Sequence, residues 1–336
     1  MCINPVYLNL LNKKTCFKYV SNNRTLFREN SMKQARQLAF GYSTKCNIRC
    51  GHCIASGQVR RDLKMDIDIA AETIPDLAGA GVSGISFTAG EPLLFPDEIG
   101  TLIEICRDRD IYTRVVTNGY WGNSEEGAQS VASALISGGL SQLRISCSRW
   151  HQEHISFNNI INCANACENT GLDYFVSFIT DFSEQDSGLE QCLQDSRLKY
   201  FPEPVIYFGK AAGLVRENIL TDFSPNTCSM NPYLTPELDM YACCDGAGRF
   251  PETDFLYLGN LRTSSADELF LRKEKNICYS LISNAGLSVI ALRLGFKAGE
   301  IVRYRKCELC GIIFNSKENL RKVKKMASAY PKLWTR

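Results

Sequence analysis

Three cysteines lie close together near the N-terminal end of the chain, at Cys46, Cys50 and Cys53. Thiolates at this spacing can hold three irons of a four-iron, four-sulfur cube and leave the fourth iron without a protein ligand. Such an iron can bind a small molecule and pass an electron to it directly. A zinc site needs a fourth ligand and more often shows paired C-x2-C elements. The spacing therefore favours an iron–sulfur cluster that acts on a bound molecule.

The segment CNIRCGHC that ends at Cys53 resembles the signature of the radical S-adenosylmethionine (AdoMet) enzymes. The resemblance implies that the open iron chelates the amino and carboxylate groups of AdoMet, and that His52 lies beside the adenine. Gly90 and Glu91, in the segment TAGEP, resemble the glycine–glutamate turn of the same family. The glycine is expected to let the backbone approach AdoMet, and the carboxylate is expected to accept hydrogen bonds from its ammonium group. The family usually has two glycines before the glutamate, and here Ala89 replaces the first.

Two later segments extend the resemblance to an AdoMet site. Thr117, Asn118 and Gly119 resemble the TNG turn that the family places near the ribose. Ser146 is expected to contact the ribose. Arg149 is expected to meet the AdoMet carboxylate, because a guanidinium fork matches a carboxylate.

A second group of cysteines lies in the C-terminal third. Cys307 and Cys310 form a C-x2-C pair, and Cys228 and Cys243 can complete four ligands. A structural zinc site with four cysteine ligands is the alternative. The segment CSMNPYLTPELDMYACC resembles the truncated form of the SPASM domain, which carries an auxiliary cluster in peptide-modifying radical AdoMet enzymes. The segment GKA from residue 209 resembles the motif that precedes that domain. The resemblance implies a second [4Fe-4S] cluster.

Cys244 is the fifth cysteine of this group and is not needed as a ligand. Adjacent residues on a strand point to opposite faces, so we expect Cys243 to ligate the auxiliary cluster and Cys244 to face the reacting centre. The adjacent pair resembles radical peptide epimerases. In those enzymes a 5′-deoxyadenosyl radical removes an α-hydrogen from an L-residue, and a cysteine on the opposite face returns hydrogen to leave a D-residue. A merely buried Cys244 is the alternative, and Cys147 is a second candidate donor.

His151 and His154 have the spacing of a metal-binding pair. No further histidine or acidic ligand follows at a convincing spacing. We therefore expect His151 to face the substrate or to satisfy its own loop.

Length and composition limit the number of domains, the partners and the cellular compartment to be expected. The 336 residues suggest two domains, and a net charge of +2 gives no reason to expect a nucleic-acid partner. No run of apolar residues is long enough to cross a bilayer, and the first residues lack the pattern of a signal peptide. Sixteen cysteines without secretion indicate metal ligation in a reducing cytoplasm.

Short apolar runs alternate with amphipathic ones and predict repeated βα units with parallel strands. A partial (β/α)6 TIM barrel and an open doubly wound sheet both fit this alternation. The chemical motifs follow the carboxyl ends of successive strands, as they do in barrel enzymes, and favour the barrel. Strands are expected at residues 38–43, 84–88, 112–117, 143–147, 174–179 and 204–208, and helices near 66–79, 96–109, 124–137, 158–170 and 187–196.

Beyond residue 215 the alternation stops. A hairpin is expected around 238–243 with a return through 256–261, followed by helices over 266–299. The predicted fold class is α/β, with an N-terminal extension (1–38), a radical AdoMet barrel (39–215) and a small α+β auxiliary-cluster domain (216–336).

The function that these expectations favour is epimerisation of a ribosomally synthesised peptide in the cytoplasm. It would use AdoMet, two [4Fe-4S] clusters and a low-potential electron donor such as flavodoxin or ferredoxin. A radical AdoMet crosslinking enzyme, which makes thioether, ether or carbon–carbon bonds, is the alternative within the family. An iron–sulfur electron carrier is the alternative from another class, and Glu91 and Asn118 argue against it because a carrier needs no AdoMet pocket.

Overall fold

The structure, a computed structural model, describes residues 36–55, 62–214 and 224–329. Contacts between residues group Ala35–Arg336 into one compact unit. Most of the expected N-terminal extension, residues 1–35, lies outside the described residues. The boundary expected at residue 215 falls in another undescribed segment, 215–223, and stays a prediction.

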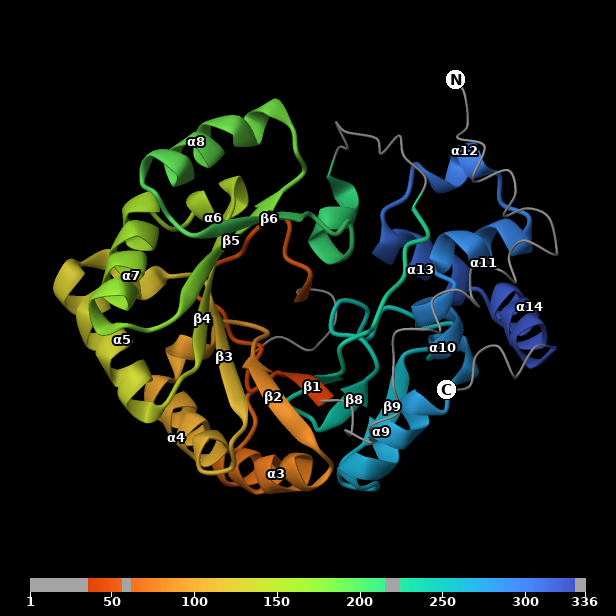
Figure 1. Ribbon diagram of the computed structural model, residues 1–336, viewed down its shortest axis with the longest axis horizontal. Helices are drawn as coiled ribbons and strands as arrows, with labels where there is room; N and C mark the ends of the chain where they lie inside the picture. Colours follow the sequence, from red (N-terminus) through yellow and green to blue (C-terminus); the bar gives the residue numbers. More distant parts are fainter. Residues whose placement is uncertain (1–35, 56–61, 215–223, 330–336) are drawn as a thin grey trace, which may run out of the picture. The chain divides into compact units, whose positions relative to one another are not determined.

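Six parallel strands follow one another in chain order and form the larger part of one sheet, as the barrel prediction requires (Figure 1). The helices between them cover the outer face of the sheet (Figure 1). Every strand but the sixth begins and ends within three residues of its expected bounds. The strands are β1 (Arg36–Phe40), β2 (Val82–Phe87), β3 (Tyr112–Thr117), β4 (Gln142–Cys147), β5 (Tyr174–Thr180) and β6 (Tyr200–Pro204).

The helices of the barrel begin and end close to the predicted residues. Ser124 caps the helix that follows it and accepts a hydrogen bond from the Gly127 amide. Gly171, with φ of +75°, ends the next long helix. The cap of that helix is Ser156 and its first residue is Phe157, so the expected start at residue 158 was one residue late. The long barrel helices are α3 (Ile67–Gly79), α4 (Pro96–Arg107), α5 (Glu125–Gly138), α7 (Phe157–Thr170) and α8 (Ser187–Asp195).

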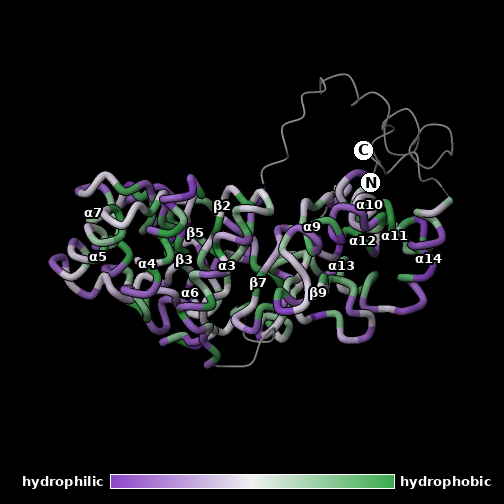
Figure 2. The backbone as a smooth tube through the Cα atoms, turned by 90° about the horizontal axis from the view of Figure 1, so that it is seen from below, coloured by the Kyte–Doolittle hydropathy of each residue, from purple (hydrophilic) through white to green (hydrophobic). Residues whose placement is uncertain are grey.

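The alternation of side chains along β4 shows how the barrel separates its two faces. Leu143, Ile145 and Cys147 are fully buried in the apolar core, whereas Arg144 and Ser146 are partly exposed and line an internal cavity. Figure 2 shows hydrophilic stretches along the outer helices and hydrophobic stretches at the strands. The expectation that Cys147 could donate hydrogen at the active-site rim is therefore wrong, because its side chain lies on the opposite face.

The sixth strand was expected at residues 204–208 and lies at Tyr200–Pro204 instead. β6 contains two prolines, Pro202 and Pro204, which are unfavourable in a central strand because proline cannot donate a hydrogen bond to a sheet. β6 is the last strand of the sheet and pairs only with β5 among the described strands. An edge strand tolerates proline, so the tertiary position of β6 overrides the local signal.

The C-terminal segment continues the barrel sheet. A short strand that the sequence did not predict, β7 (Tyr233–Leu234), pairs in parallel with β1. The expected hairpin is present as β8 (Asp239–Tyr241) and β9 (Tyr257–Asn260), which pair antiparallel. The helices that follow are α9 (Ala266–Glu274), α10 (Ile277–Asn284), α11 (Leu287–Leu294), α12 (Ala298–Ile301), α13 (Lys306–Phe314) and α14 (Lys317–Ser328).

Among the described residues, no single helix combines the length and the apolar character needed to cross a membrane. The bent pair α10 and α11 would pass such a test by length and composition alone.

Candidate active site

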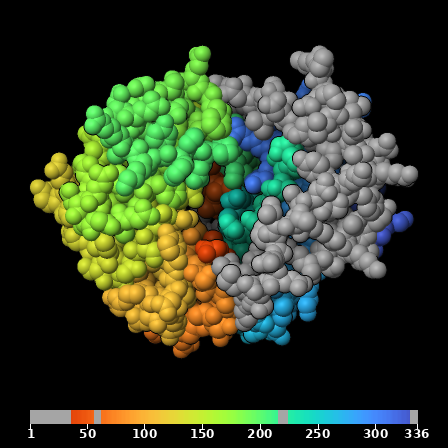
Figure 3. All heavy atoms as spheres, in the orientation of Figure 1, coloured from red at the N-terminus to blue at the C-terminus, as the bar shows by residue number. Residues whose placement is uncertain are grey.

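A cavity of about 510 Å³ lies inside the barrel, at the end where the cysteine loop enters. Figure 3 shows the hollow between the barrel and the C-terminal segment, with residues near the start of the barrel deep inside it. The wall brings together residues from the cysteine loop, from the ends of β2, β3 and β4, and from the turn after β8. Of the residues proposed from the sequence, it contains Cys46, Cys50, His52, Cys53, Gly90, Glu91, Thr117, Asn118, Ser146 and Cys244.

Gly90 brings the turn after β2 against the backbone that leads into the cysteine loop. Its φ is +42°, and a Cβ atom there would lie 2.2 Å from the Lys45 carbonyl oxygen. The next amide, of Glu91, donates a hydrogen bond to the same oxygen at 2.7 Å. Any side chain at position 90 would push the turn off the loop. We expected Gly90 to allow a close approach to AdoMet, and the structure shows that it allows a close approach to the cysteine loop.

The Glu91 carboxylate ties two turns of the wall together. Oε1 accepts hydrogen bonds from the Leu93 amide at 3.0 Å and from the Thr117 hydroxyl at 2.8 Å, and Oε2 accepts one from the Asn118 amide at 2.7 Å. Burial raises the pKa of Glu91 to about 7, although these donors act to lower it. A carboxylate has about four acceptor positions, so one position remains for a further donor. An ammonium contact there stays a prediction.

Replacement of Glu91 by alanine is expected to destabilise the chain by roughly 3 kcal/mol, because three buried donors would lose their acceptor. Glu91 is 1% exposed, so its truncation would leave a buried cavity. The three donors would stay unpaired unless water entered that cavity. Urea unfolding of the metal-free chain, followed by circular dichroism under reducing conditions, measures the effect. An unchanged unfolding midpoint would contradict the role of Glu91 as a tie between the turns.

The Glu91→Gln variant tests the electrostatics of the same site. Below about pH 4.5 the carboxyl group is protonated in both the folded and the unfolded chain. Between about pH 4.5 and 7 the unfolded chain releases the proton while the folded chain retains it, so stability falls as pH rises. The stability of the wild type relative to Glu91→Gln should therefore fall by about 3 kcal/mol across this window and then level off. A difference that does not change with pH would contradict the raised pKa.

Asn118 connects the turn after β3 with the cysteine loop. Its side-chain amide donates to the Asn47 Oδ1 atom at 2.9 Å and lies 3.9 Å from the Cys46 sulfur. The Thr117 hydroxyl accepts hydrogen bonds from the Trp121 indole and from the Gly119 backbone amide. These contacts let Asn118 hold the cysteine loop, whereas those of Thr117 brace its own turn against Glu91. Contacts of Thr117, Asn118 and Ser146 with a ribose stay predictions.

His52 and His151 lie together at the cavity. The His52 ring stacks on Trp150, with 4.8 Å between centroids, and meets the His151 ring edge-on at the same distance. Burial lowers the pKa of His52 to about 4 and that of His151 to about 3, so both rings are neutral near pH 7. His151 Nδ1 is 2.8 Å from the Ser148 hydroxyl, whereas the buried Nδ1 of His52 has no hydrogen-bond partner among the described residues. A neutral ring with an unused nitrogen is compatible with the expected place beside adenine.

The metal-like grouping in this region differs from the spacing seen in the sequence. His154 is exposed and does not converge with His151. Instead, ligand atoms of Cys50, His52 and His151 lie within 4.8 Å of one another. The sequence carried no signal for this grouping, because residues about a hundred positions apart meet only when β4 lies beside the cysteine loop.

The expectation for Arg149 is wrong. Its guanidinium does not line the cavity and binds two buried carboxylates, Asp181 at 2.7 and 3.1 Å and Asp186 at 2.7 Å. The hydrogen bond with Asp181 raises the pKa of Arg149 and holds that of Asp181 well below its usual range. The guanidinium also lies 4.0 Å from the centre of the Trp150 ring. Because its fork is already occupied by carboxylates of the chain, Arg149 positions Trp150 and not a ligand.

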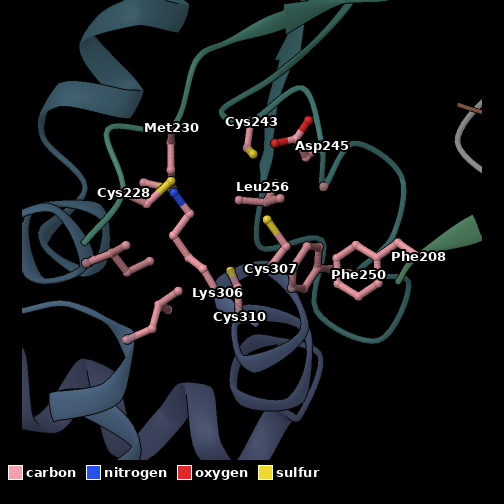
Figure 4. Close-up of a pocket in the computed structure, with 13 residues that line it drawn as sticks. Phe208, Cys228, Met230, Cys243, Asp245, Phe250, Leu256, Lys306, Cys307 and Cys310 are labelled. Atoms are coloured by element: carbon pink, nitrogen blue, oxygen red, sulfur yellow. The ribbon is translucent and has the colours of Figure 1, made fainter. Parts of the chain in front are cut away.

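A second pocket lies beside the C-terminal helices and is lined by Cys228, Cys243, Cys307 and Cys310 (Figure 4). Figure 4 shows their sulfur atoms turned toward one shared space, with the Lys306 side chain beside them. Burial raises the pKa of Cys228, Cys307 and Cys310, and the charge of Lys306 partly opposes this effect. Four thiols around one space suit either a [4Fe-4S] cluster or a tetrahedral zinc ion, so the donor set fits the expected auxiliary cluster.

Cys243 and Cys244 both follow the end of β8, so the alternation of side chains along a strand does not explain their different surroundings. β8 ends at Tyr241, so the argument from adjacent strand residues does not apply. Nevertheless Cys243 lines the second pocket and Cys244 lines the large cavity. A hydrogen bond between the two lowers the pKa of Cys243 and raises that of Cys244. The Cys244 sulfur is also 3.5 Å from the Asp245 carboxylate. Cys244 therefore holds its proton more strongly than Cys243 does.

Comparison with known proteins agrees with this geometry. Residues 41–193 match the radical SAM superfamily, and this range contains the cysteine loop and strands β2 to β5. The chain therefore contains a radical SAM domain, built as a partial barrel. Such a domain uses AdoMet and a [4Fe-4S] cluster.

Individual relatives are distant. The protein YydG of Bacillus subtilis strain 168, whose name refers to peptide biosynthesis, is 23% identical over 192 residues, which is 56% of this chain and 60% of YydG. The GTP 3′,8-cyclase of Chlorobaculum tepidum is 37% identical over 65 residues, which is 19% of each chain. The chain thus spans three fifths or less of these curated relatives. A solved structure of anSMEcpe with bound AdoMet has a TM-score of 0.57 at 14% identity, covering 89% of this chain and 98% of that one, and shows a shared fold.

Proposed function

We propose that this protein is a radical AdoMet enzyme that converts L-residues to D-residues in a ribosomally synthesised peptide. The observation that carries the proposal is the division of the adjacent cysteines between two pockets. Cys244 faces the cavity that also contains Cys46, Cys50 and Cys53, and Cys243 faces the pocket of the other cysteines. The name of the relative YydG, which refers to peptide biosynthesis, supports a peptide as the substrate.

The chain's own residues divide the work as follows. Cys46, Cys50 and Cys53 would hold the cluster that binds AdoMet, and His52 would lie beside the adenine. Gly90, Glu91 and Asn118 keep the cysteine loop in place through the contacts described above. Cys228, Cys243, Cys307 and Cys310 would hold the auxiliary cluster. Bound AdoMet, given one electron that originates from a low-potential donor such as flavodoxin or ferredoxin, supplies a 5′-deoxyadenosyl radical that takes hydrogen from carbon.

Cys244 would complete the reaction. Loss of an α-hydrogen leaves a planar carbon, and the face that receives hydrogen decides the handedness of the product. The thiol would give one hydrogen atom to the face opposite the one that lost it, so that the carbon is inverted and sulfur is left one electron short. A proton and an electron from the donor would then restore the thiol. The raised pKa of Cys244 favours this role, because a thiolate carries no hydrogen to give.

The proposal is tested by isotope incorporation. The chain is incubated anaerobically in deuterated water with AdoMet, a reductant and a peptide encoded beside its gene. Because an S–H group exchanges with solvent, each inverted residue should gain one deuterium at its α-carbon with no other change in mass. Tandem mass spectrometry locates the label, and chiral analysis of the hydrolysed peptide identifies the D-residue.

A crosslinking enzyme would give a different result under the same conditions. A new thioether, ether or carbon–carbon bond removes two hydrogen atoms from the peptide, so the product would be two mass units lighter and would gain no α-deuterium. Such a product would show that the enzyme crosslinks its peptide and does not epimerise it. The proposed use of AdoMet would be unaffected. Failure to form 5′-deoxyadenosine with any candidate peptide would favour an electron carrier. A cytoplasmic location stays part of the proposal, because free thiols in this number suit a reducing compartment.

A further inference from the structure

Arg249 has a buried guanidinium that the proposed chemistry has not yet used. Its Nε and Nη2 atoms are inaccessible to water and have no hydrogen-bond partner among the described residues. The guanidinium carbon lies 5.0 Å from the centre of the Phe208 ring, which supports its flat face. The side chain as a whole is partly exposed, but N–H groups of a cation that are buried without an acceptor are unfavourable. These two groups therefore favour an anionic acceptor other than a side chain of the described part of the protein.

The surroundings place Arg249 beside the first cysteine motif. Gly209 has a φ of +58°, and a Cβ atom there would lie 3.1 Å from Arg249 Nη2 and 2.8 Å from the Cys53 carbonyl oxygen. A glycine at this position thus leaves room for the guanidinium next to the cysteine loop. The same glycine begins the GKA segment, for which the sequence suggested no structural reason.

The charges that act on Arg249 come from both sets of cysteines. Burial lowers the pKa of Arg249 to about 10, and Asp245, Cys53, Cys307 and Cys243 oppose this effect. Cys53 belongs to the loop in the large cavity, whereas Cys243 and Cys307 line the second pocket. The Phe208 ring that supports the guanidinium also lines the second pocket, whereas Gly209 brings the guanidinium beside the Cys53 carbonyl, so one guanidinium lies next to both sites.

We propose that Arg249 is a positioning residue shared by the two iron–sulfur sites, where its charge and its two unpartnered N–H groups face the anionic clusters. This inference rests on the two-cluster assignment of the proposed function. A [4Fe-4S] cluster with its thiolates carries net negative charge, and reduction adds more. A nearby cation with N–H donors stabilises the reduced form, so Arg249 makes both clusters easier to reduce.

The test measures the reduction potential of each cluster alone. Arg249→Gln is introduced into a Cys307→Ala/Cys310→Ala background, which would keep only the AdoMet cluster. It is also introduced into a Cys46→Ala/Cys50→Ala/Cys53→Ala background, which would keep only the auxiliary cluster. Redox titration followed by electron paramagnetic resonance should show each cluster at least tenfold harder to reduce at a fixed potential, which is 59 mV for a one-electron couple. Arg249→Lys, which keeps the charge, should fall between wild type and Arg249→Gln.

Lys306 provides a matched control. It lines the second pocket and not the large cavity, so Lys306→Gln should change the potential of the auxiliary cluster alone. A change in only one cluster for Arg249→Gln, or unchanged potentials with full iron content, would overturn the shared role. Those outcomes differ from failure of the proposed function, which would appear in the wild type as a missing cluster or as absence of 5′-deoxyadenosine.

A second measurement applies if Arg249→Gln cannot be loaded with iron. In the metal-free chain the buried Nε and Nη2 groups have no hydrogen-bond acceptor among the described residues, so removal of the guanidinium should raise the thermal unfolding temperature. A purely structural arginine would give the opposite result. A lower unfolding temperature for metal-free Arg249→Gln than for metal-free wild type would overturn the inference.

Discussion

Replacement of Cys244 by alanine is expected to reduce D-residue formation by on the order of a hundredfold, which corresponds to about 2.7 kcal/mol of lost transition-state stabilisation. AdoMet cleavage to 5′-deoxyadenosine should continue, because Cys244 lies outside the expected ligand sets of both clusters. The peptide radical would then be formed without a donor on its opposite face. It should be quenched by unselective routes, and side products should accumulate. Chiral amino-acid analysis and quantification of 5′-deoxyadenosine measure the two effects separately.

The matched control for this variant is Cys147→Ala. Cys147 is fully buried on the helix-facing side of β4 and does not line the cavity, so its removal should leave epimerisation intact. Normal D-residue formation by Cys244→Ala would show that another group returns hydrogen. The loss of 5′-deoxyadenosine together with D-residues would indicate that the substitution had damaged the site as a whole, and iron analysis of the variant detects that case.

The second large effect is expected for the triple variant Cys46→Ala/Cys50→Ala/Cys53→Ala. It should lose all AdoMet cleavage, because no cluster with an open iron could form in the large cavity. Anaerobically reconstituted wild type should contain about eight irons per chain, from two four-iron clusters. The triple variant should retain about four, held by the second set of cysteines. Iron and sulfide determination, with electron paramagnetic resonance of the reduced protein, provides the measurement.

A complementary variant separates the two sites. Cys307→Ala/Cys310→Ala removes two of the four thiols in the second pocket and should lose the other half of the iron while it still cleaves AdoMet. One zinc ion and four irons in the native protein would contradict the auxiliary cluster and leave the AdoMet site unaffected. Equal iron in the wild type and the triple variant would contradict the assignment of the cysteine loop.

Local sequence determined much of the barrel. The spacing of Cys46, Cys50 and Cys53 is a property of one short loop, and ligand spacing within a loop can be read without the fold. Helix ends such as Ser124 and Gly171 depend on a hydrogen bond to a near neighbour and on a left-handed backbone angle. The order of the parallel strands also follows from the regular βα alternation, because successive units pack side by side.

Contacts between distant residues decided the remainder. Two prolines lie in β6 because an edge strand has one free side, and edge position is a property of the whole sheet. Arg149 looked suited to a carboxylate and found two, Asp181 and Asp186, on the neighbouring strand–helix connection. The residue type of Arg149 indicated that it would bind a carboxylate, but not whether that carboxylate belonged to a bound ligand or to the chain itself.

The different surroundings of Cys243 and Cys244 likewise depend on tertiary structure. The sequence marked the pair as unusual, but the reason proposed from strand geometry does not hold, since both residues follow the end of β8. β7 pairs with β1 of the barrel, and β8 pairs with β7. The turn after β8 is thereby brought to the cysteine loop, and Cys244 in this turn lines the large cavity. Arg249 carried no signal in the sequence at all, because its significance lies in two buried N–H groups without a partner among the described residues, and only the packed structure shows which groups surround them.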